Sequence, residues 1–406
     1  MKVEDLLRDS LHDLADKGAA PRPGFADRVL AARRRRRTRR HATVIAAVAA
    51  VVAVAVTGPL LGRGDGPEPA DKDKKAVDVI ARTDQSPPRE LIAAADVAVS
   101  AYTVPRTVML KNKDKLRTRV WYLYDPRTGR YQKTGWGWVA VAPGMRRAAV
   151  LEGELPAGRI GLLDLATGKV DRWIRMARPV GGLAFSPDGT RLVATSYSCD
   201  PDLLRLHEDF YHGYGDDPDQ DAWLPQRCRT GFTVLDARSG QGEFAAVPES
   251  DRDGDPEAGG RNDFAFSADG RLLSEHLPTA KPYRRYYDAQ GTAQPVPDTA
   301  RHLDVLTAGV SPDGRRIAQA KEVLDARTGR KLHGFRQPVL EFLAWADDDH
   351  LIAWGCEPDH CGGKGEFTSR LVLVSPDDDE IVPLSGYRGE TREDGDAWTP
   401  VFTRRR

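Results

Sequence analysis

The sequence lacks the short motifs that mark many enzymes. It contains no Gly-x-Ser-x-Gly nucleophile elbow and no glycine-rich loop with the spacing that cradles a phosphate. No set of residues combines a nucleophile with a base and an oxyanion-stabilising group. We therefore expect a protein that is not an enzyme, with no catalytic residues, no bound metal and no cofactor.

The chain also lacks net charge, but its N-terminal part is basic and the remainder is acidic. Its 406 residues carry 60 basic and 60 acidic side chains. Residues 1–41 hold twelve bases and six acids, a net charge of +6, whereas residues 42–62 hold no charge. The remainder is mildly acidic, which argues against a nucleic-acid partner. A hydrophobic content of 40% excludes wholesale disorder.

One long apolar run stands near the N-terminus, ATVIAAVAAVVAVAVTGPLL over residues 42–61. Twenty helical residues reach about 30 Å, the hydrocarbon thickness of a bilayer. Basic residues directly precede the run and favour a cytoplasmic N-terminus: Arg33, Arg34, Arg35, Arg36, Arg37, Arg39 and Arg40. We expect a single transmembrane helix over 42–62 in the cell membrane, with the C-terminal part outside; a cleaved signal peptide is the alternative.

The segment before this helix, residues 1–41, is basic and amphipathic. Leu7, Leu11 and Leu14 share one face of a short predicted helix. This cytoplasmic segment is either a tail lying along the membrane or a docking peptide for a cytosolic protein. Residues 63–94 follow the helix and are expected to act as a linker.

An internal repeat dominates the rest of the chain. One element reads LAFSPDG at 183–189, FAFSADG at 264–270 and AGVSPDG at 308–314, with looser copies at 139–145 and 343–349. Each is an alternating apolar strand that runs into a Pro/Ala-Asp-Gly turn. Pro presets φ, Asp caps its own turn and Gly adopts the left-handed conformation. The element therefore predicts a tight antiparallel hairpin.

A second repeated turn follows apolar strands further along each unit. It reads DPRTG at 125–129, DLATG at 164–168, DARSG at 236–240, DAQG at 288–291 and DARTG at 325–329. Two hairpins per unit give four antiparallel strands, which is the content of one propeller blade. The turns begin 39, 72, 52 and 37 residues apart, a period near forty residues, and the insertion at 199–228 accounts for the longest step.

The two ends of the repeat region complement one another. The final residues, PVFTRRR at 400–406, align with the first strand of a unit, whereas residues 96–102 look like a second strand. We expect the C-terminal strand to complete the N-terminal blade and close a ring. The predicted fold is all-β, a six-bladed propeller over 95–406, with seven blades as the alternative.

The Ser-Pro-Asp-Gly and Thr-Gly turns of residues 95–406 resemble WD40-like and TolB-type propeller repeats. The Gly-His and Trp-Asp pairs of eukaryotic WD repeats are missing, and Ala, Arg and Gly are frequent, so the resemblance favours the bacterial TolB-like branch. The resemblance implies a scaffold for binding. With the predicted membrane helix, we expect an extracytoplasmic binding or scaffolding module for a cell-envelope protein, peptide or glycan. The alternatives are a transmembrane regulator similar to anti-sigma proteins, whose N-terminal segment binds a cytosolic protein, and a hydrolase or lyase in the propeller funnel.

All four cysteines fall in the half predicted to lie outside. Both pairs occupy the loop between the second and third strands of a unit, so we expect the disulfides Cys199–Cys228 and Cys356–Cys361. Metal binding with His207, His212 or His360 is the alternative. The acidic loop at 250–260 resembles a calcium loop but has Pro256 where glycine is required.

The insertion at 199–228 is the best candidate for recognition. It combines acidic residues with the aromatic residues Phe210, Tyr211, Tyr214 and Trp223. Aromatic and polar loops on a rigid ring are typical recognition surfaces. The alternative is that these aromatic side chains only pack the insertion against the rim of the blade.

Overall fold

The computed structural model describes residues 77–207, 222–248, 260–277, 282–304, 307–335, 339–356, 369–377, 381–388 and 397–405. The chain divides into two units, Met1–Asp73 and Lys74–Arg406, and every described residue belongs to the second. The predicted span at 42–62, its flanking arginines and the docking candidates Leu7, Leu11 and Leu14 lie outside the described residues. Within the described ranges, no helix has the length and apolar character needed to cross a membrane.

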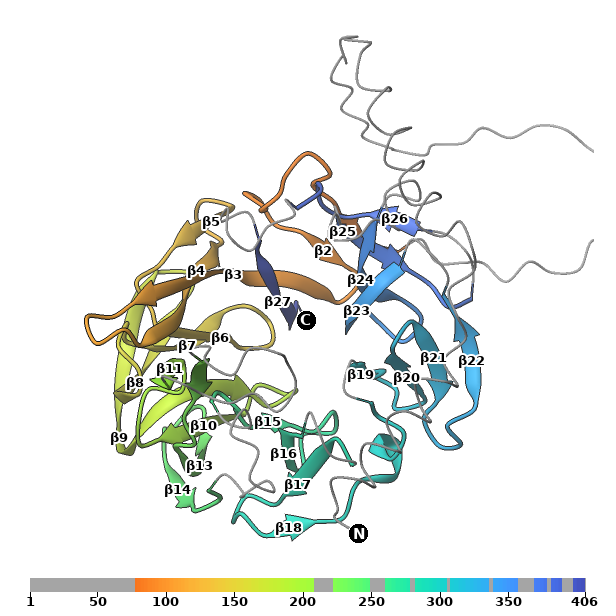
Figure 1. Ribbon diagram of the computed structural model, residues 1–406. Coiled ribbons are helices and arrows are strands. Elements are labelled where there is room, and N and C mark those ends of the chain that lie inside the picture. The colour runs from red at the N-terminus through yellow and green to blue at the C-terminus, as the bar shows by residue number, and fades with distance from the viewer. Residues whose placement is uncertain are drawn as a thin grey trace, which may run out of the picture. The chain divides into compact units, whose positions relative to one another are not determined.

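The unit Lys74–Arg406 is built of antiparallel sheets that follow one another around a ring (Figure 1). The first sheet joins both ends of the unit: β27 (Thr399–Arg404), β3 (Val97–Met109), β4 (Lys115–Asp125) and β5 (Arg130–Lys133). The fold is therefore all-β and propeller-like, as the repeats predict.

The next two sets of strands share one long strand. The second set contains β6 (Trp138–Val141), β7 (Arg147–Leu151), β8 (Ala157–Asp164) and the first part of β9 (Lys169–Phe185). The later part of β9 then pairs with the third set, which continues through β10 (Arg191–Tyr197), β13 (Arg229–Asp236) and β14 (Gly242–Ala245). One continuous strand thus joins two neighbouring sets.

Three further sheets of four strands complete the ring. The first has β15 (Ala265–Phe266), β16 (Leu273–His276), β17 (Arg284–Tyr287) and β18 (Ala293–Gln294). After the short 3-10 helix η1 (Asp298–Ala300) come β19 (Thr307–Val310), β20 (Arg316–Gln319), β21 (Glu322–Asp325) and β22 (Lys331–Gly334). The last has β23 (Val339–Trp345), β24 (Leu351–Cys356), β25 (Ser369–Val374) and β26 (Ile381–Pro383).

The repeated Ser-x-Asp-Gly element forms the same turn in three sheets. At Ser186 the hydroxyl donates to the Asp188 carboxylate at 2.5 Å and accepts the N–H of Arg191 at 2.9 Å. The turns at Ser267 and Ser311 repeat both hydrogen bonds. The glycine of each turn has a φ between 71° and 77°, a conformation that glycine adopts without a steric penalty. The motif therefore ends β9, β15 and β19 for a local chemical reason.

The Asp-to-Gly turns connect the third and fourth strands. In four of them the glycine N–H donates to the aspartate carbonyl four residues earlier, at 2.8–2.9 Å: Asp125, Asp164, Asp236 and Asp325. The carboxylates of these aspartates also accept backbone N–H groups inside the turn. Both predicted hairpins are thus present, and together they account for four strands per repeat.

These turns make stability sensitive to acid. The Ser186 hydroxyl and the Thr190 N–H lower the pKa of Asp188 from 3.8 to about 2. Because the folded-state pKa lies below the unfolded value, the stabilisation is present above about pH 4 and is lost as the pH falls toward 2. We expect Asp188→Asn to lower the Tm at pH 7 by roughly 1–3 °C and to flatten the fall in Tm between pH 4 and 2. Calorimetry across this interval tests the expectation.

Asp171→Asn is the matched control for that measurement. Asp171 is exposed on β9 and lies outside the turns. If the control and Asp188→Asn gave the same pH profile of Tm, the turn carboxylate would not be the acid-sensitive group.

The C-terminal strand closes the ring, as predicted. β27 pairs antiparallel with β3 from Thr399↔Thr103 to Arg404↔Val97. Ser100 Oγ and Thr403 Oγ1 are 2.8 Å apart and hydrogen-bonded. The first sheet therefore joins strands from opposite ends of the unit. The two hydrogen-bonded hydroxyls are 303 residues apart in the sequence.

Trp398, directly before β27, is fully buried where the last and first sheets meet. Its ring lies edge-to-face against Tyr102 of β3, at 5.7 Å, and against Trp354 of β24, at 5.3 Å. Its Nε1–H donates to Ser86 Oγ at 3.0 Å. Burial of this large ring, with its N–H hydrogen-bonded, stabilises the junction between the first and last sheets.

The predicted linker at 63–94 needs a correction at its C-terminal end. β1 (Val79–Ile80) pairs with β2 (Ala93–Ala94), and β2 pairs with β3. Ile92 is 1% exposed, and the Arg82 N–H donates to the carbonyl of Leu384 in the last sheet. The folded unit therefore includes this segment, because its apolar residues fill the junction between the first and last sheets.

Candidate functional site

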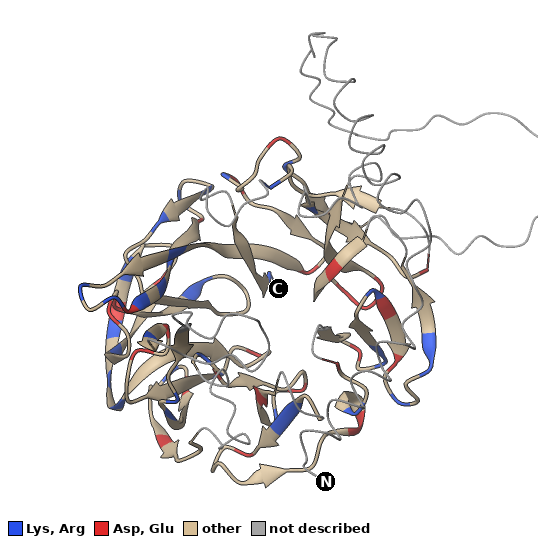
Figure 2. Ribbon diagram, viewed as in Figure 1, with Lys and Arg blue, Asp and Glu red and all other residues tan. Residues whose placement is uncertain are grey.

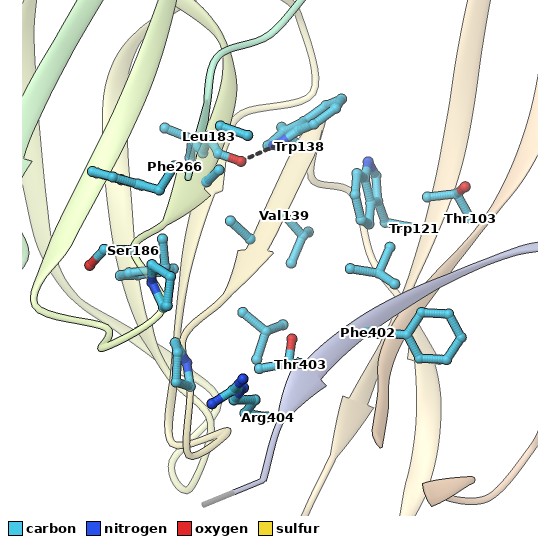
Figure 3. Close-up of a pocket in the computed structure, with 18 of the residues that line it drawn as sticks. Thr103, Trp121, Trp138, Val139, Leu183, Ser186, Phe266, Phe402, Thr403 and Arg404 are labelled. Atoms are coloured by element: carbon cyan, nitrogen blue, oxygen red, sulfur yellow. Dashed lines mark hydrogen bonds between the residues drawn. The ribbon is translucent and has the colours of Figure 1, made fainter. Parts of the chain in front are cut away.

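A cavity of about 570 Å³ lies among the inner strands of the first four sets of strands. β27, β6, the later part of β9 and β15 all contribute to its walls (Figure 3). These strands carry the apolar residues of the repeat, and consecutive residues such as Val139, Ala140 and Val141 line the space. The cavity is thus a direct product of the repeated sequence.

The walls are mainly aromatic and aliphatic. Trp121 and Trp138 lie at one end, with ring centroids 5.4 Å apart, and Arg404 lies toward the other end (Figure 3). Trp121 Nε1–H donates to the Gly137 carbonyl at 3.1 Å, and Trp138 Nε1–H donates to the Leu183 carbonyl at 3.0 Å. Because both indole N–H groups are used by the backbone, the tryptophans offer the cavity apolar ring surface rather than donors.

A cluster of ionised side chains borders the cavity at Trp138. Asp202, at the start of the insertion, accepts from Arg119 of β4 at 2.6 Å. It also accepts from Arg261 through both carboxylate oxygens, at 2.9 and 2.6 Å. The two guanidinium groups lie 5.1 and 4.3 Å from the Trp138 ring, within the range of cation–π attraction. We call Arg119, Asp202 and Arg261 the clasp.

A second carboxylate extends the clasp to the third and fourth sets of strands. Asp263 accepts from Arg261 at 3.0 Å and from the Tyr197 hydroxyl at 2.9 Å. Burial, together with Asp263, raises the pKa of Tyr197 well above 10. Burial opposes the charge of Arg261, but its hydrogen bonds to Asp202 and the nearby carboxylates raise its pKa above the usual value. The cluster is therefore internally hydrogen-bonded, and it ties the insertion to three parts of the ring.

The sequence analysis missed the clasp, and the repeat marks only two residues that contact it. Trp138, Gly182 and Asp263 occupy the same position, one residue before the inner-strand motif. Trp138 lines the cavity, whereas Asp263 accepts a hydrogen bond from Arg261. At Gly182 an added Cβ would lie 2.1 Å from Asp263 Oδ1, so only glycine leaves room for that carboxylate. Comparison of this one position across the repeats would have pointed to Trp138 and Asp263, which both contact Arg261.

The described part of the insertion forms a hairpin, β11 (Leu203–His207) with β12 (Ala222–Pro225), and β11 pairs with β4 of the first sheet. Trp223 Nε1–H donates to the Lys113 carbonyl at 3.0 Å, and the Lys115 ammonium lies 3.1 Å from its ring centroid. Trp223 thus fastens the insertion to the hairpin β3–β4, which fits the packing alternative. Phe210, Tyr211 and Tyr214 lie outside the described residues, and their recognition role stays a prediction.

The predicted disulfide Cys199–Cys228 is present and closes the base of the insertion, between β10 and β13. Cys356 is also disulfide-bonded, whereas Cys361, its predicted partner, lies outside the described residues. The acidic residues at 250–259 lie outside them as well. Among the residues that the structure describes, no three His, Cys, Asp or Glu side chains gather as metal ligands.

Comparison with known proteins adds little to this description. No protein-family model matches the chain, and no curated protein matches it. Among solved structures, it is similar to the β-propeller domain of Cps50 (Swd1) from Myceliophteria thermophila. That similarity has a TM-score of 0.36 and 13% identity, over 73% of this chain and 88% of that chain.

Proposed function

We propose that the ring is a binding module that takes an extended protein segment into the central cavity. The observation that carries this proposal is the wall of the cavity, where Trp121, Trp138, Phe266 and Phe402 surround about 570 Å³. Cavities of this size, mostly apolar with a few polar groups, are typical ligand sites. The closed ring holds these side chains on strands rather than on loops, so the site is formed before a ligand arrives.

The polar groups of the cavity favour an acidic ligand. The described residues that line it include Arg119 and Arg404 but no Asp, Glu, Asn or Gln. Arg404 is exposed, and it has no ion-pair partner among the described residues. A glycan with many hydroxyl donors would find few acceptor side chains here. An apolar side chain next to a carboxylate, as in an acidic-hydrophobic peptide or a peptide C-terminus, matches both the rings and the free guanidinium.

The proposal places this module outside the cytoplasm, as a six-bladed TolB-like propeller on a membrane anchor. The apolar run at 42–61 and the preceding arginines support the anchor. The disulfide Cys199–Cys228 supports an oxidising compartment. Six sets of four strands within the described residues support six blades. In this proposal the chain performs no chemistry, and its partner is an envelope protein or peptide.

A selection from a displayed random peptide library, with the full chain as bait, tests the proposal. We expect enriched peptides that combine an aromatic or aliphatic residue with a neighbouring carboxylate. Ala265→Trp should abolish their binding, because Ala265 is exposed in the cavity and a large side chain there fills it. Enrichment without this pattern, or peptides that bind the Ala265→Trp variant equally well, would contradict the proposal.

Arg404→Glu should weaken peptides from that selection by roughly 10- to 100-fold, because it replaces a charge-assisted hydrogen bond by repulsion. The conservative variant Arg404→Lys should retain most of the affinity. Both side chains are exposed at the same position of β27, so the Tm of the two variants should agree. Fluorescence anisotropy of a labelled peptide measures the affinities, and equal affinities for Glu and Lys would remove Arg404 from the site.

A further inference from the structure

The hairpin β3–β4 is longer than ring closure requires. β4 pairs with β3 as far as Met109↔Lys115, whereas β27 pairs with β3 only up to Thr103. Figure 1 shows the hairpin continuing past the end of β27. Residues 105–109 are all exposed, in contrast to the buried residues earlier in β3. We call residues 105–117 the projecting hairpin.

The tip of the projecting hairpin exposes apolar side chains on both of its faces. Val108 is 44% exposed and Met109 is 56% exposed. Adjacent residues of a strand point to opposite faces, so the two side chains lie on different sides of the hairpin. A flat protein partner covers one face of a hairpin. Exposed apolar groups on both faces are better covered by the acyl chains of a lipid bilayer, which can surround the tip.

The exposed charged side chains of the projecting hairpin are all positive. Arg106, Lys111 and Arg117 are exposed. Figure 2 shows blue Lys and Arg positions along this hairpin at the left of the ring. Its only acid, Asp114, is 4% exposed and is hydrogen-bonded to the Leu206 N–H at 2.9 Å and to Arg205 at 2.8 Å. Those hydrogen bonds lower the pKa of Asp114, so it stays ionised and internally paired. The exposed surface therefore favours an anionic partner.

The same buried contacts hold the projecting hairpin rigid. Asp114 joins its turn to β11, and Trp223 of β12 donates to the Lys113 carbonyl. Pairing of β11 with Leu116 and Lys115 braces the side of β4. The tip is thus presented at a fixed place and needs no ordering when it binds, which lowers the entropy lost on binding.

The exposed edge of β3 is poorly suited to a protein strand. Pro105 has no backbone N–H to donate, and Arg106 follows it directly; both features block edge-to-edge pairing. Two neighbouring aliphatic side chains flanked by cations are the composition of segments that lie in the interface of an anionic bilayer. Charge and shape thus agree on lipid rather than on a strand partner.

We infer that the projecting hairpin inserts Val108 and Met109 into the surface of a bilayer containing anionic phospholipid, while Arg106, Lys111 and Arg117 contact the headgroups. This contact goes beyond peptide binding in the cavity and is separate from the predicted helix at 42–62. Insertion of the hairpin would set the direction in which the ring faces the membrane.

A fluorescent reporter on the full chain tests the inference. Met109→Cys carries an environment-sensitive nitrobenzoxadiazole label, and the protein is reconstituted with vesicles of phosphatidylcholine alone or mixed with phosphatidylglycerol. We expect a blue shift, and quenching by brominated acyl chains, in the mixed vesicles only. Leu332→Cys on β22, which is 43% exposed, is the matched control and should report water in both.

Charge reversal separates lipid contact from mere proximity to the membrane. Each basic side chain near an anionic surface strengthens binding roughly fivefold. Arg106→Glu, Lys111→Glu and Arg117→Glu together should therefore lower the equilibrium constant for tip insertion by roughly 100-fold or more. The Tm should stay unchanged, since the three side chains are exposed. A label at 109 that reports water in mixed vesicles would overturn the inference. So would a label that becomes buried only when an acidic protein is added, which would assign the hairpin to a protein partner.

Discussion

Deletion of residues 399–406 should unfold the ring rather than shorten it. β27 supplies the inner strand of the first sheet, and its loss uncovers the edge of β3 from Val97 to Thr103. Ser100 and Tyr102, which are 1% and 5% exposed in the closed ring, would lose cover. A freed sheet edge with apolar neighbours also invites association with other chains. We expect the Tm to fall by roughly 10 °C or more, accompanied by aggregation.

Scanning calorimetry and light scattering measure both effects. Removal of Arg406 alone, beyond the last strand, is the matched control and should leave the Tm unchanged. A synthetic peptide spanning 399–405 should restore stability to the truncated chain, because the missing strand then pairs in trans. An unchanged Tm after truncation, or a peptide that binds without raising the Tm, would show that β27 does not close the ring.

Glu275→Ala should produce the largest effect of a single substitution. Glu275 and Arg229 form an ion pair with side chains 1% and 0% exposed, and the Tyr287 hydroxyl donates to the same carboxylate at 2.6 Å. Burial and this carboxylate raise the pKa of Tyr287 to about 12, so the phenol keeps its proton. Removal of Glu275 leaves a buried guanidinium without its counter-charge. Loss of one partner from such a pair costs about 3–5 kcal/mol.

Urea unfolding of a double-mutant cycle tests that value. Arg229→Met with Glu275→Leu should recover most of the lost stability, because an apolar pair of similar volume needs no counter-charge. The exposed pair Arg159 and Glu152, with side chains 46% and 44% exposed, is the matched control. Glu152→Ala should hardly change the urea midpoint. If Glu275→Ala and Glu152→Ala had equal effects, burial would not set the strength of the Arg229 pair.

The sequence was informative wherever structure is decided locally. The turns at Ser186 and Asp236 are built from hydrogen bonds within five residues, so the sequence motif alone is enough to predict each turn. Ring closure was also predictable, since PVFTRRR at 400–406 ends where a turn motif should follow. The disulfide Cys199–Cys228 followed from the equivalent positions of the two cysteine pairs in the repeat. Each of these features repeats or interrupts a pattern that is visible along the chain.

The clasp could not be predicted in the same way. Arg119 and Arg261 meet Asp202 across separations of 83 and 59 residues, and the ring geometry alone brings them together. The predicted boundary at residue 94 was too late because strands of two residues, such as β1 and β2, have no periodicity to detect. The pairing of β11 with β4 skips the whole second set of strands. Long-range contacts of this kind leave no local signal in the sequence.

The pairing of β3 with β27 also has a consequence for synthesis. Ser100 and Thr403 are separated by 303 residues, and a ribosome working at about 5–20 residues per second needs roughly 15–60 s to cover that distance. During this time the edge of β3 that pairs with β27 remains unpaired, while the residues of the later sheets are synthesised. Co-translational folding can therefore complete the middle of the ring first, and the edge of β3 stays open until β27 has been synthesised.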